Sequence, residues 1–396
     1  MNSRGHNGAV RLSHRLAGGT EPNRWARERA ELIASGVELT ELSDTNPTRH
    51  GLLDERVLEV LAEATRRAGR YDPDPRGWMG ARQALAARFG GEADDYWLTA
   101  STSQAYGWLF TLLTDPGDAV AVPAPGYPLI GPLTRLADAF THDYQAHYLH
   151  PSGWEYDLDS VRAATADPRT RALVVVNPAN PTGAYTDGPT AAALNEICAA
   201  GGIPLIADEV FWPFRLDQSS PQPVRLAAAG GDATTFTLDG LSKLLCAPQL
   251  KLGWMRLSGP GRSLAAPLLD QIADTYLGVN SPVALALPGL LELADDAVTV
   301  VRTRLATNLA TLRATFAEGG YRVRTDGGGW MALLDPPPVA DDAALALHLL
   351  RAAHLSVHPG WFYDLDSPAP LALSLLPEPA AFTVACARLR AGVEAL

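Results

Sequence analysis

Residues 172–183 read ALVVVNPANPTG, an apolar run that ends in a polar, proline-rich turn. Two similar apolar runs, AVAVP at 119–123 and IPLIADEV at 203–210, precede and follow it in the chain. Helical patterns at 103–113 and 188–200 lie between these runs. Short apolar strands that alternate with helices are typical of a parallel sheet, whose strands are buried on both faces and need no polar alternation. We therefore predict an α/β fold with a mostly parallel central sheet.

The pattern changes after about residue 285. A long helix is expected over 287–318, and YRVRTDGGGWMALL (321–334) then indicates a strand, a glycine turn and a second strand. Further strands are expected in HLSVHPG (354–360) and PLALSLLP (370–377), and a terminal helix over 379–394. The predicted organisation is an N-terminal arm with part of a small domain at 1–50, a large domain at 51–285 and a small α+β C-terminal domain at 286–396.

The charge, apolar runs and cysteines of the chain narrow its partners and its environment. The chain has 396 residues and a formal net charge of −12, which argues against nucleic acid or an anionic membrane as the main partner. No run of about 18 apolar residues is present, so we expect no membrane span. The first residues lack the apolar segment of a secretory signal, so we expect no signal peptide. Three cysteines without CxxC spacing favour neither a disulfide framework nor a metal site, and fit the reducing cytoplasm.

Polar residues gather at the ends of the predicted strands, where ligands bind in open α/β sheets. They lie in TASTSQAYGW (99–108), at Asn180 in the proline-rich turn, at Asp208, and at Lys243 in LDGLSKLLCAPQLKLGW (238–254). Each has an ordinary structural explanation when taken alone: a helix cap, a turn, a capping carboxylate or a surface lysine. In this order and spacing, they together predict a ligand site at one edge of the sheet.

On these motifs the sequence resembles the class I and II aminotransferases, which are pyridoxal 5'-phosphate (PLP) enzymes of fold type I. The resemblance covers roughly residues 40–390 and is specific at NPANPTG, at ADEV 31 residues after Asn177, and at the lysine 35 residues after Asp208. It implies that Lys243 holds PLP as a Schiff base and then acts as the proton shuttle at Cα. It also implies that Asp208 pairs with the pyridine nitrogen, which makes the ring an electron sink, and that Asn180 donates to the phenolic oxygen.

The resemblance extends to further groups around the cofactor. Ser101, Thr102 and Ser103 precede a predicted helix, and their backbone N–H groups and hydroxyls suit a phosphate at its N-terminus. Tyr127 corresponds to an aromatic residue that stacks on the ring, Tyr71 to a tyrosine that reaches the phosphate of a neighbouring subunit, and LGVNSP (277–282) to a loop that crosses the interface. A homodimer with shared active sites is thus implied. The implied cofactor-binding residues are Ser101, Thr102, Ser103, Tyr127, Asn180, Asp208, Ser242, Lys243, Lys251 and Tyr71.

Four positions depart from the family pattern. Phe211 stands where the family usually has a tyrosine that hydrogen-bonds the phenolic oxygen, and Gly240 where it usually has a phosphate-binding serine. Lys251 replaces an arginine and supplies its charge without the bidentate fork. Ala372, in LALSLLP, replaces the arginine that grips the substrate α-carboxylate as a bidentate pair. The last departure implies either another carboxylate-binding group or an unusual substrate.

Several residues are candidates for contacts with the substrate. Asn46, Arg49 and Phe211 are expected near it. The candidate replacements for the missing arginine are Arg49, Arg76 and Arg215, with placement at the surface as the ordinary alternative. Four aromatic residues either line a large apolar pocket or belong to the core: Trp212, Trp330, Trp361 and Phe362.

The leading functional prediction is an enzyme that acts at Cα of an amino acid or amine, as an aminotransferase with an atypical substrate. The departures also fit specialised enzymes of natural-product biosynthesis, so a C–S β-lyase, a decarboxylating oxidative deaminase and other Cα chemistry such as racemisation remain open. A PLP-binding regulator without catalysis is disfavoured. Only about 40 residues precede the fold, the chain is acidic, and Lys243, Asp208 and Asn180 are all present.

Overall fold

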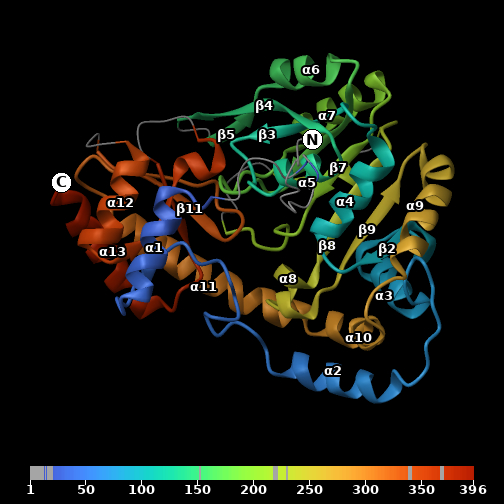
Figure 1. The fold of residues 1–396 in the computed structure, drawn as a ribbon, viewed down its shortest axis with the longest axis horizontal. Helices are drawn as coiled ribbons and strands as arrows, with labels where there is room; N and C mark the ends of the chain where they lie inside the picture. Colours follow the sequence, from blue (N-terminus) through green and yellow to red (C-terminus); the bar gives the residue numbers. More distant parts are fainter. Residues whose placement is uncertain are drawn as a thin grey trace, which may run out of the picture.

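The computed structural model describes Ser13, Arg15 and residues 21–150, 153–216, 222–228, 231–337, 341–365 and 370–396. Its centre is an eight-stranded sheet with helices on both faces (Figure 1). In spatial order the strands are β2 (Tyr96–Thr99), β9 (Gly253–Ser258), β8 (Thr235–Gly240), β7 (Leu205–Asp208), β6 (Thr170–Val176), β3 (Ala119–Ala124), β4 (Phe140–Leu149) and β5 (Gly153–Tyr156). The strands from β8 to β4 run parallel, whereas β9, β2 and β5 run antiparallel to their neighbours. The predicted mostly parallel α/β sheet is confirmed.

The parallel strands are apolar because both of their faces are covered. Val174 of β6 and Ile206 of β7 pack toward α4 (Thr102–Leu113), α5 (Ile130–Leu136) and α9 (Arg262–Tyr276). Val175 and Ala207, the next residues along, pack toward α6 (Leu158–Ala166) and α7 (Gly188–Gly201). Successive strand residues alternate between the faces, and each fully buried aliphatic side chain contributes about 1.5–3 kcal/mol. The apolar runs in the sequence therefore hold both helical layers to the sheet.

The C-terminal part of the chain builds a second, antiparallel sheet of four strands. Its order is β10 (Arg322–Arg324), β11 (Met331–Asp335), β14 (Leu371–Ser374) and β13 (His358–Pro359). A separate apolar cluster joins this sheet to α11 (Ala294–Thr315), α12 (Asp342–Ala352) and α13 (Pro379–Glu394). The N-terminal segment belongs here too, because β1 (Thr40–Glu41) pairs with β12 (Leu355–Ser356) and α1 (Arg24–Ala34) packs on α12 (Figure 1). The domain boundaries at residues 50 and 285 stay a prediction.

A third group of helices, α2 (Arg56–Arg67), α3 (Met79–Phe89) and α10 (Ser281–Glu292), packs beside β2 and β9. The single helix expected over 287–318 is wrong, since α10 and α11 are separate helices that meet at Leu293. The first of them begins early because the Asn280 side chain accepts the N–H of Val283 and a proline occupies its first turn. Of the predicted N-terminal arm, residues 1–20 lie outside the described residues except for Ser13 and Arg15. Among the described helices, none is long and apolar enough to cross a membrane.

Candidate active site

A pocket of about 420 Å³ opens at the carboxyl ends of β6, β7 and β8. Val176, Asp208 and Gly240, the last residues of these strands, all line it. Residues of the C-terminal part close its other side, among them Trp330, Met331, His358, Phe362 and Tyr363. The pocket thus lies between the two sheets, at the edge where parallel α/β sheets bind ligands.

Lys243 reaches this pocket from α8 (Leu241–Leu244), the short helix that directly follows β8. Its Nζ lies 4.8 Å from the centre of the Trp330 ring system and 5.2 Å from the centre of the Phe211 ring. Burial lowers the pKa of this amine, while Cys246 and Asp208 act in the opposite direction. A desolvated lysine with a lowered pKa is the form that attacks a carbonyl carbon.

Asp208 is held from two directions. Its Oδ2 accepts a hydrogen bond from the Tyr106 hydroxyl at 3.0 Å, and its Oδ1 accepts one from the Val210 N–H at 3.3 Å. Burial raises the pKa of Asp208 to about 6, and the two hydrogen bonds and the charge of Lys243 oppose that rise. Tyr106, on α4, is only 2% exposed. The motifs do not mark Tyr106, and its one signal in the sequence is its place in TASTSQAYGW, one turn into the predicted helix.

Asn180 lies in the loop that joins β6 to α7 and lines the pocket. Asn177 fixes the start of this loop: its side chain accepts the Thr186 N–H at 3.0 Å and donates to a backbone carbonyl at 3.0 Å. The other end is fixed by Gly183, which has a φ of 75° and on which a Cβ would lie 2.6 Å from the carbonyl oxygen of Gly328. The loop is therefore clamped between the large sheet and the glycine turn before β11.

The N-terminus of α4 forms another wall. Ser101 caps this helix by accepting the Gln104 N–H at 3.2 Å, and Ser101 and Thr102 line the pocket. A Cβ on Gly253 would lie 3.1 Å from the carbonyl carbon of Ser101 and from the nitrogen of Thr102, and one on Gly240 would lie 3.1 Å from the Gly253 Cα. Gly240 therefore stands where a serine would crowd the backbone of β9. Helix N–H groups and hydroxyls in such a cradle suit an anion such as phosphate.

The other predicted cofactor residues fall into two groups. Ser242 and Tyr127 line the pocket, and Tyr127 is 40% exposed. Ser103, Lys251 and Tyr71 lie outside the lining, with Lys251 exposed in a left-handed conformation and Tyr71 67% exposed. A single chain thus brings most of the predicted cofactor-binding residues to one pocket around Lys243. Ser103, Lys251 and Tyr71 of the same chain do not line it.

The predicted substrate residues divide in the same way. Phe211 lines the pocket, whereas Asn46 and Arg49 lie outside its lining. The Asn46 side chain accepts the Thr48 N–H at 3.1 Å, and Arg49 pairs with Asp44 at 3.2 Å. Of the four aromatic candidates, two line the pocket and two do not: Trp330 and Phe362 do, and Trp212 and Trp361 do not.

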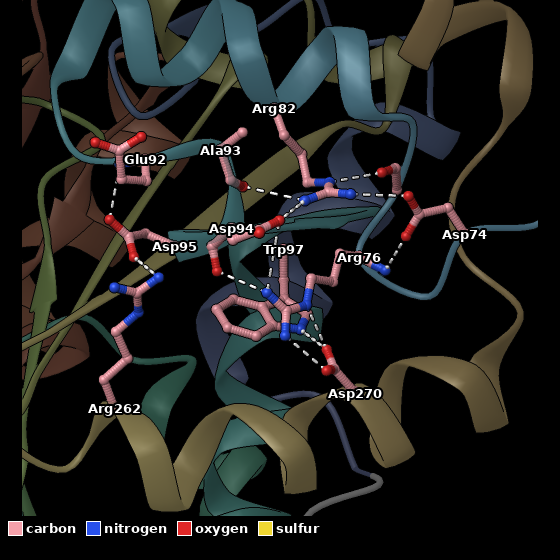
Figure 2. A network of polar contacts seen from close by, with 11 residues as sticks. Asp74, Arg76, Arg82, Glu92, Ala93, Asp94, Asp95, Trp97, Arg262 and Asp270 are labelled. Atoms are coloured by element: carbon pink, nitrogen blue, oxygen red, sulfur yellow. Dashed lines mark hydrogen bonds and ion pairs between the residues drawn. The ribbon is translucent and has the colours of Figure 1, made fainter.

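Arg76 and Arg215 also lie outside this lining. Figure 2 shows Arg76 in a polar network with Asp270 and Trp97. Its Nε and Nη2 each donate to Asp270 at 2.7 Å, and the guanidinium lies 4.5 Å from the centre of the Trp97 ring system. Asp270 thus occupies the bidentate face that a substrate carboxylate would need. Arg215 lines a second cavity, of about 700 Å³.

Ala372 is fully buried in β14, opposite Leu333 of β11 on one side and His358 of β13 on the other. It packs with Met331 and Tyr363, which both line the pocket. The Tyr363 hydroxyl lies 3.4 Å from the Met331 Sδ and 3.0 Å from the His358 Nδ1. These three side chains therefore form the pocket wall next to Ala372.

Comparison with known proteins finds matches along most of the chain. The family described as aminotransferase class I and II matches residues 43–388. An alanine aminotransferase of Mycobacterium tuberculosis is 27% identical over 367 residues, which cover 88% of this chain and 84% of that protein. A probable N-succinyldiaminopimelate aminotransferase of the same species is 30% identical over 281 residues, which cover 69% of this chain and 68% of that protein.

The fold is likewise found in solved structures. An alanine aminotransferase from Pyrococcus furiosus matches with a TM-score of 0.89 at 23% identity, covering 98% of this chain and 100% of that chain. These relatives are aminotransferases and give no support to a lyase or an oxidative deaminase. The chain therefore belongs to the class I and II aminotransferases, a family of PLP-dependent enzymes of fold type I.

Proposed function

We propose that this chain is an aminotransferase that binds PLP covalently through Lys243. The observation that supports this most strongly is that Lys243, Asp208 and Asn180, from three separate motifs, line one pocket. When bound, the cofactor supplies an aldehyde that accepts an amino group and a ring that stabilises negative charge at the substrate Cα. All the remaining steps fall to the side chains of this chain.

The groups around the pocket suit the parts of this cofactor. The Asp208 carboxylate would accept the ring N–H, and the hydrogen bond from Tyr106 would keep the carboxylate oriented. Asn180 would donate to the phenolic oxygen. The N-terminus of α4 would hold the phosphate together with the Ser242 hydroxyl, and Tyr127 would stack on the ring. A cationic ring nitrogen offsets the cost of burying Asp208, because opposite charges favour each other's ionised forms.

Lys243 acts on the proton at the substrate Cα. Its lowered pKa favours the neutral amine, which is the form that acts as a base. The Trp330 and Phe211 rings beside Nζ keep water away from the amine. Lys243 would therefore hold the cofactor and then move the proton at the substrate Cα.

The remaining predicted residues fit a homodimer with shared sites, in the cytoplasm. Tyr71, with its exposed ring, is proposed to reach the phosphate in the partner's pocket. Large apolar side chains are exposed on the nearby helices α2 and α3, among them Leu58, Trp78 and Met79, and an interface would cover them. Lys251 is proposed to add charge near the phosphate, and Asn46 to lie near the substrate. Arg49 instead pairs with Asp44 and is turned toward solvent. The three cysteines are buried and unpaired, as suits a reducing compartment.

Transfer of nitrogen is the direct test of this function. The purified enzyme is supplied with PLP, isotope-labelled amino donors and one of three acceptors: pyruvate and 2-oxoglutarate, which the names of its relatives indicate, or phenylacetaldehyde, which carries no carboxylate. The labelled amine or amino acid of at least one acceptor should form with wild type, and none should form with Lys243→Ala. Ammonia and a thiol from an S-conjugated cysteine, without labelled product, would instead support a C–S β-lyase. Release of carbon dioxide with an aldehyde or amide would support the decarboxylating reaction.

A further inference from the structure

We propose that the preferred amino donor is a primary amine with an apolar, ring-sized group and without a carboxylate on the carbon that bears the nitrogen. The proposal rests on the function above and names its substrate class. Among the described residues that line the pocket, Lys243 is the one lysine or arginine and Asp208 is the one carboxylate.

Neither of these charges is available to a substrate carboxylate. Lys243 is committed to the cofactor and the proton, and Asp208 is an anion that would repel a second one. His358 is the other titratable nitrogen in the lining, and burial lowers its pKa to about 4, so it is neutral at pH 7. A buried carboxylate without a cationic partner is strongly disfavoured, because it loses its hydration without compensation.

The arginines considered as replacements are held elsewhere. Both donor atoms on one edge of Arg76 are engaged by Asp270, and Arg49 pairs with Asp44 on the exposed side of its loop. Arg215 lines the separate cavity of about 700 Å³. No arginine is found among the described residues that line the pocket around Lys243.

The wall beside Ala372 offers mainly apolar contact. Met331 and Tyr363 pack with Ala372 in one apolar cluster, and both line the pocket. Phe211 and Trp330 stand edge to face, with ring centres 5.5 Å apart, next to Nζ. Aromatic edges and faces of this kind stabilise a bound apolar ring, whereas they give a carboxylate no partner.

The reaction with such a donor balances without an external oxidant. The amine loses its amino group and one hydrogen from the adjacent carbon and becomes an aldehyde or ketone, whose oxygen comes from water. The amino group is kept on the enzyme and then passes to an aldehyde or ketone acceptor that likewise carries no carboxylate on its carbonyl carbon, and this returns the enzyme to its starting form. Each half-reaction thus exchanges one amino group for one carbonyl oxygen.

Matched donors test the proposal on the PLP-loaded wild-type enzyme. Phenethylamine is compared with phenylalanine, and isoamylamine with leucine, by single-turnover conversion of the cofactor absorbance. We expect each amine to react at least about tenfold faster at equal concentration. Faster reaction of the amino acid in both pairs, or no reaction of either amine, would overturn the proposal. Labelled nitrogen transfer from amino acids in the same preparation would then show that the aminotransferase function itself stands.

Binding of unreactive ligands gives a second readout. Calorimetry compares 3-phenylpropan-1-ol with 3-phenylpropionate, which differ mainly in the charged group. Wild type should bind the alcohol about tenfold more tightly, and Ala372→Arg should reverse the order. Val384→Arg, which adds the same charge on the exposed face of α13, is the matched control and should behave as wild type. Tighter binding of 3-phenylpropionate than of the alcohol by wild type would contradict the proposal. If Ala372→Arg does not fold, the comparison of the two ligands on wild type is the test.

Discussion

Asp208 and Lys243 respond to the same burial in opposite directions. The pKa of Asp208 is raised to about 6 and that of Lys243 is lowered, so desolvation favours the uncharged form of both. A cationic ring nitrogen beside Asp208 would instead favour the ionised carboxylate, so PLP binding and ionisation of Asp208 are linked. The affinity for PLP should therefore fall as the pH drops below about 6.

Tyr106→Phe tests how this carboxylate is tuned. Loss of the hydroxyl removes a hydrogen bond that lowers the pKa of Asp208, so the pKa should rise further. A hydrogen bond to a charged group contributes about 1.5–3 kcal/mol, which moves the acidic limb of the pH profile of kcat/KM upward by about one to two pH units. An unchanged acidic limb would show that Tyr106 does not tune Asp208.

Asp208→Asn should have a pH-dependent effect on the stability of the protein freed of PLP. The pKa of Asp208 in the folded state, about 6, lies above the ordinary value of 3.8, so its contribution to stability is complete below about pH 4 and is lost as the pH rises through about 6. Asparagine avoids this loss, which amounts to about 3 kcal/mol at most. The thermal midpoint of the variant should match wild type near pH 4 and exceed it at about pH 8. Equal thermal midpoints of variant and wild type at about pH 8 would show that ionisation of buried Asp208 does not destabilise the PLP-free protein.

At the scale of elements, the ends of three parallel strands assemble the centre of the site. Asn180, Asp208 and Lys243 were predictable as neighbours because the carboxyl ends of parallel strands share one edge of the sheet. Tyr106 was not, since it reaches Asp208 through the packing of α4 on the sheet. Met331 and His358 come from a second sheet, and no local pattern tells which of its residues face the first sheet.

The cradle at the start of α4 makes a prediction about this element. In Gly253→Ala the new Cβ meets the backbone of Ser101 and Thr102 at 3.1 Å, so the helix N-terminus must shift by a few tenths of an ångström. We expect PLP to bind about tenfold more weakly in fluorescence titrations. Gly107→Ala is the matched control: it lies on the same helix, its Cβ meets nothing within 4 Å, and PLP affinity should be unchanged. Equal PLP affinity of the two variants would show that the N-terminus of α4 does not bind the phosphate.

At the scale of the whole molecule, the two sheets enclose the pocket, and large apolar side chains on α2 and α3 are exposed. The mostly parallel core was predictable from its apolar runs, since strands covered on both faces need no polar residues. The antiparallel strands β9 and β5 were not singled out, nor was the break between α10 and α11. Periodicity alone does not give the pairing direction of a short strand. It also does not place the break at Leu293, because Pro288 and Gly289 lie within α10 and no glycine or proline lies at the break itself.

A shared active site can be tested by mixing two inactive variants. If Tyr71 serves the partner's pocket, a heterodimer of Tyr71→Ala with Lys243→Ala contains one intact site and one site with both lesions. Refolding the two together should restore about a quarter of the wild-type activity, because half of the dimers are mixed and each has one working site. Activity no higher than that of Tyr71→Ala alone would show that Tyr71 acts within its own chain or not at all.

The most direct test of the central claim is borohydride reduction of the PLP-loaded enzyme, followed by mass analysis of its peptides. The reduced cofactor should be found on Lys243, in the segment that contains LDGLSKLL, and the yellow absorption band should vanish with it. Lys243→Ala should take up no label. A label on Lys251, or a wild-type protein that stays colourless and unlabelled after PLP is supplied, would contradict the account.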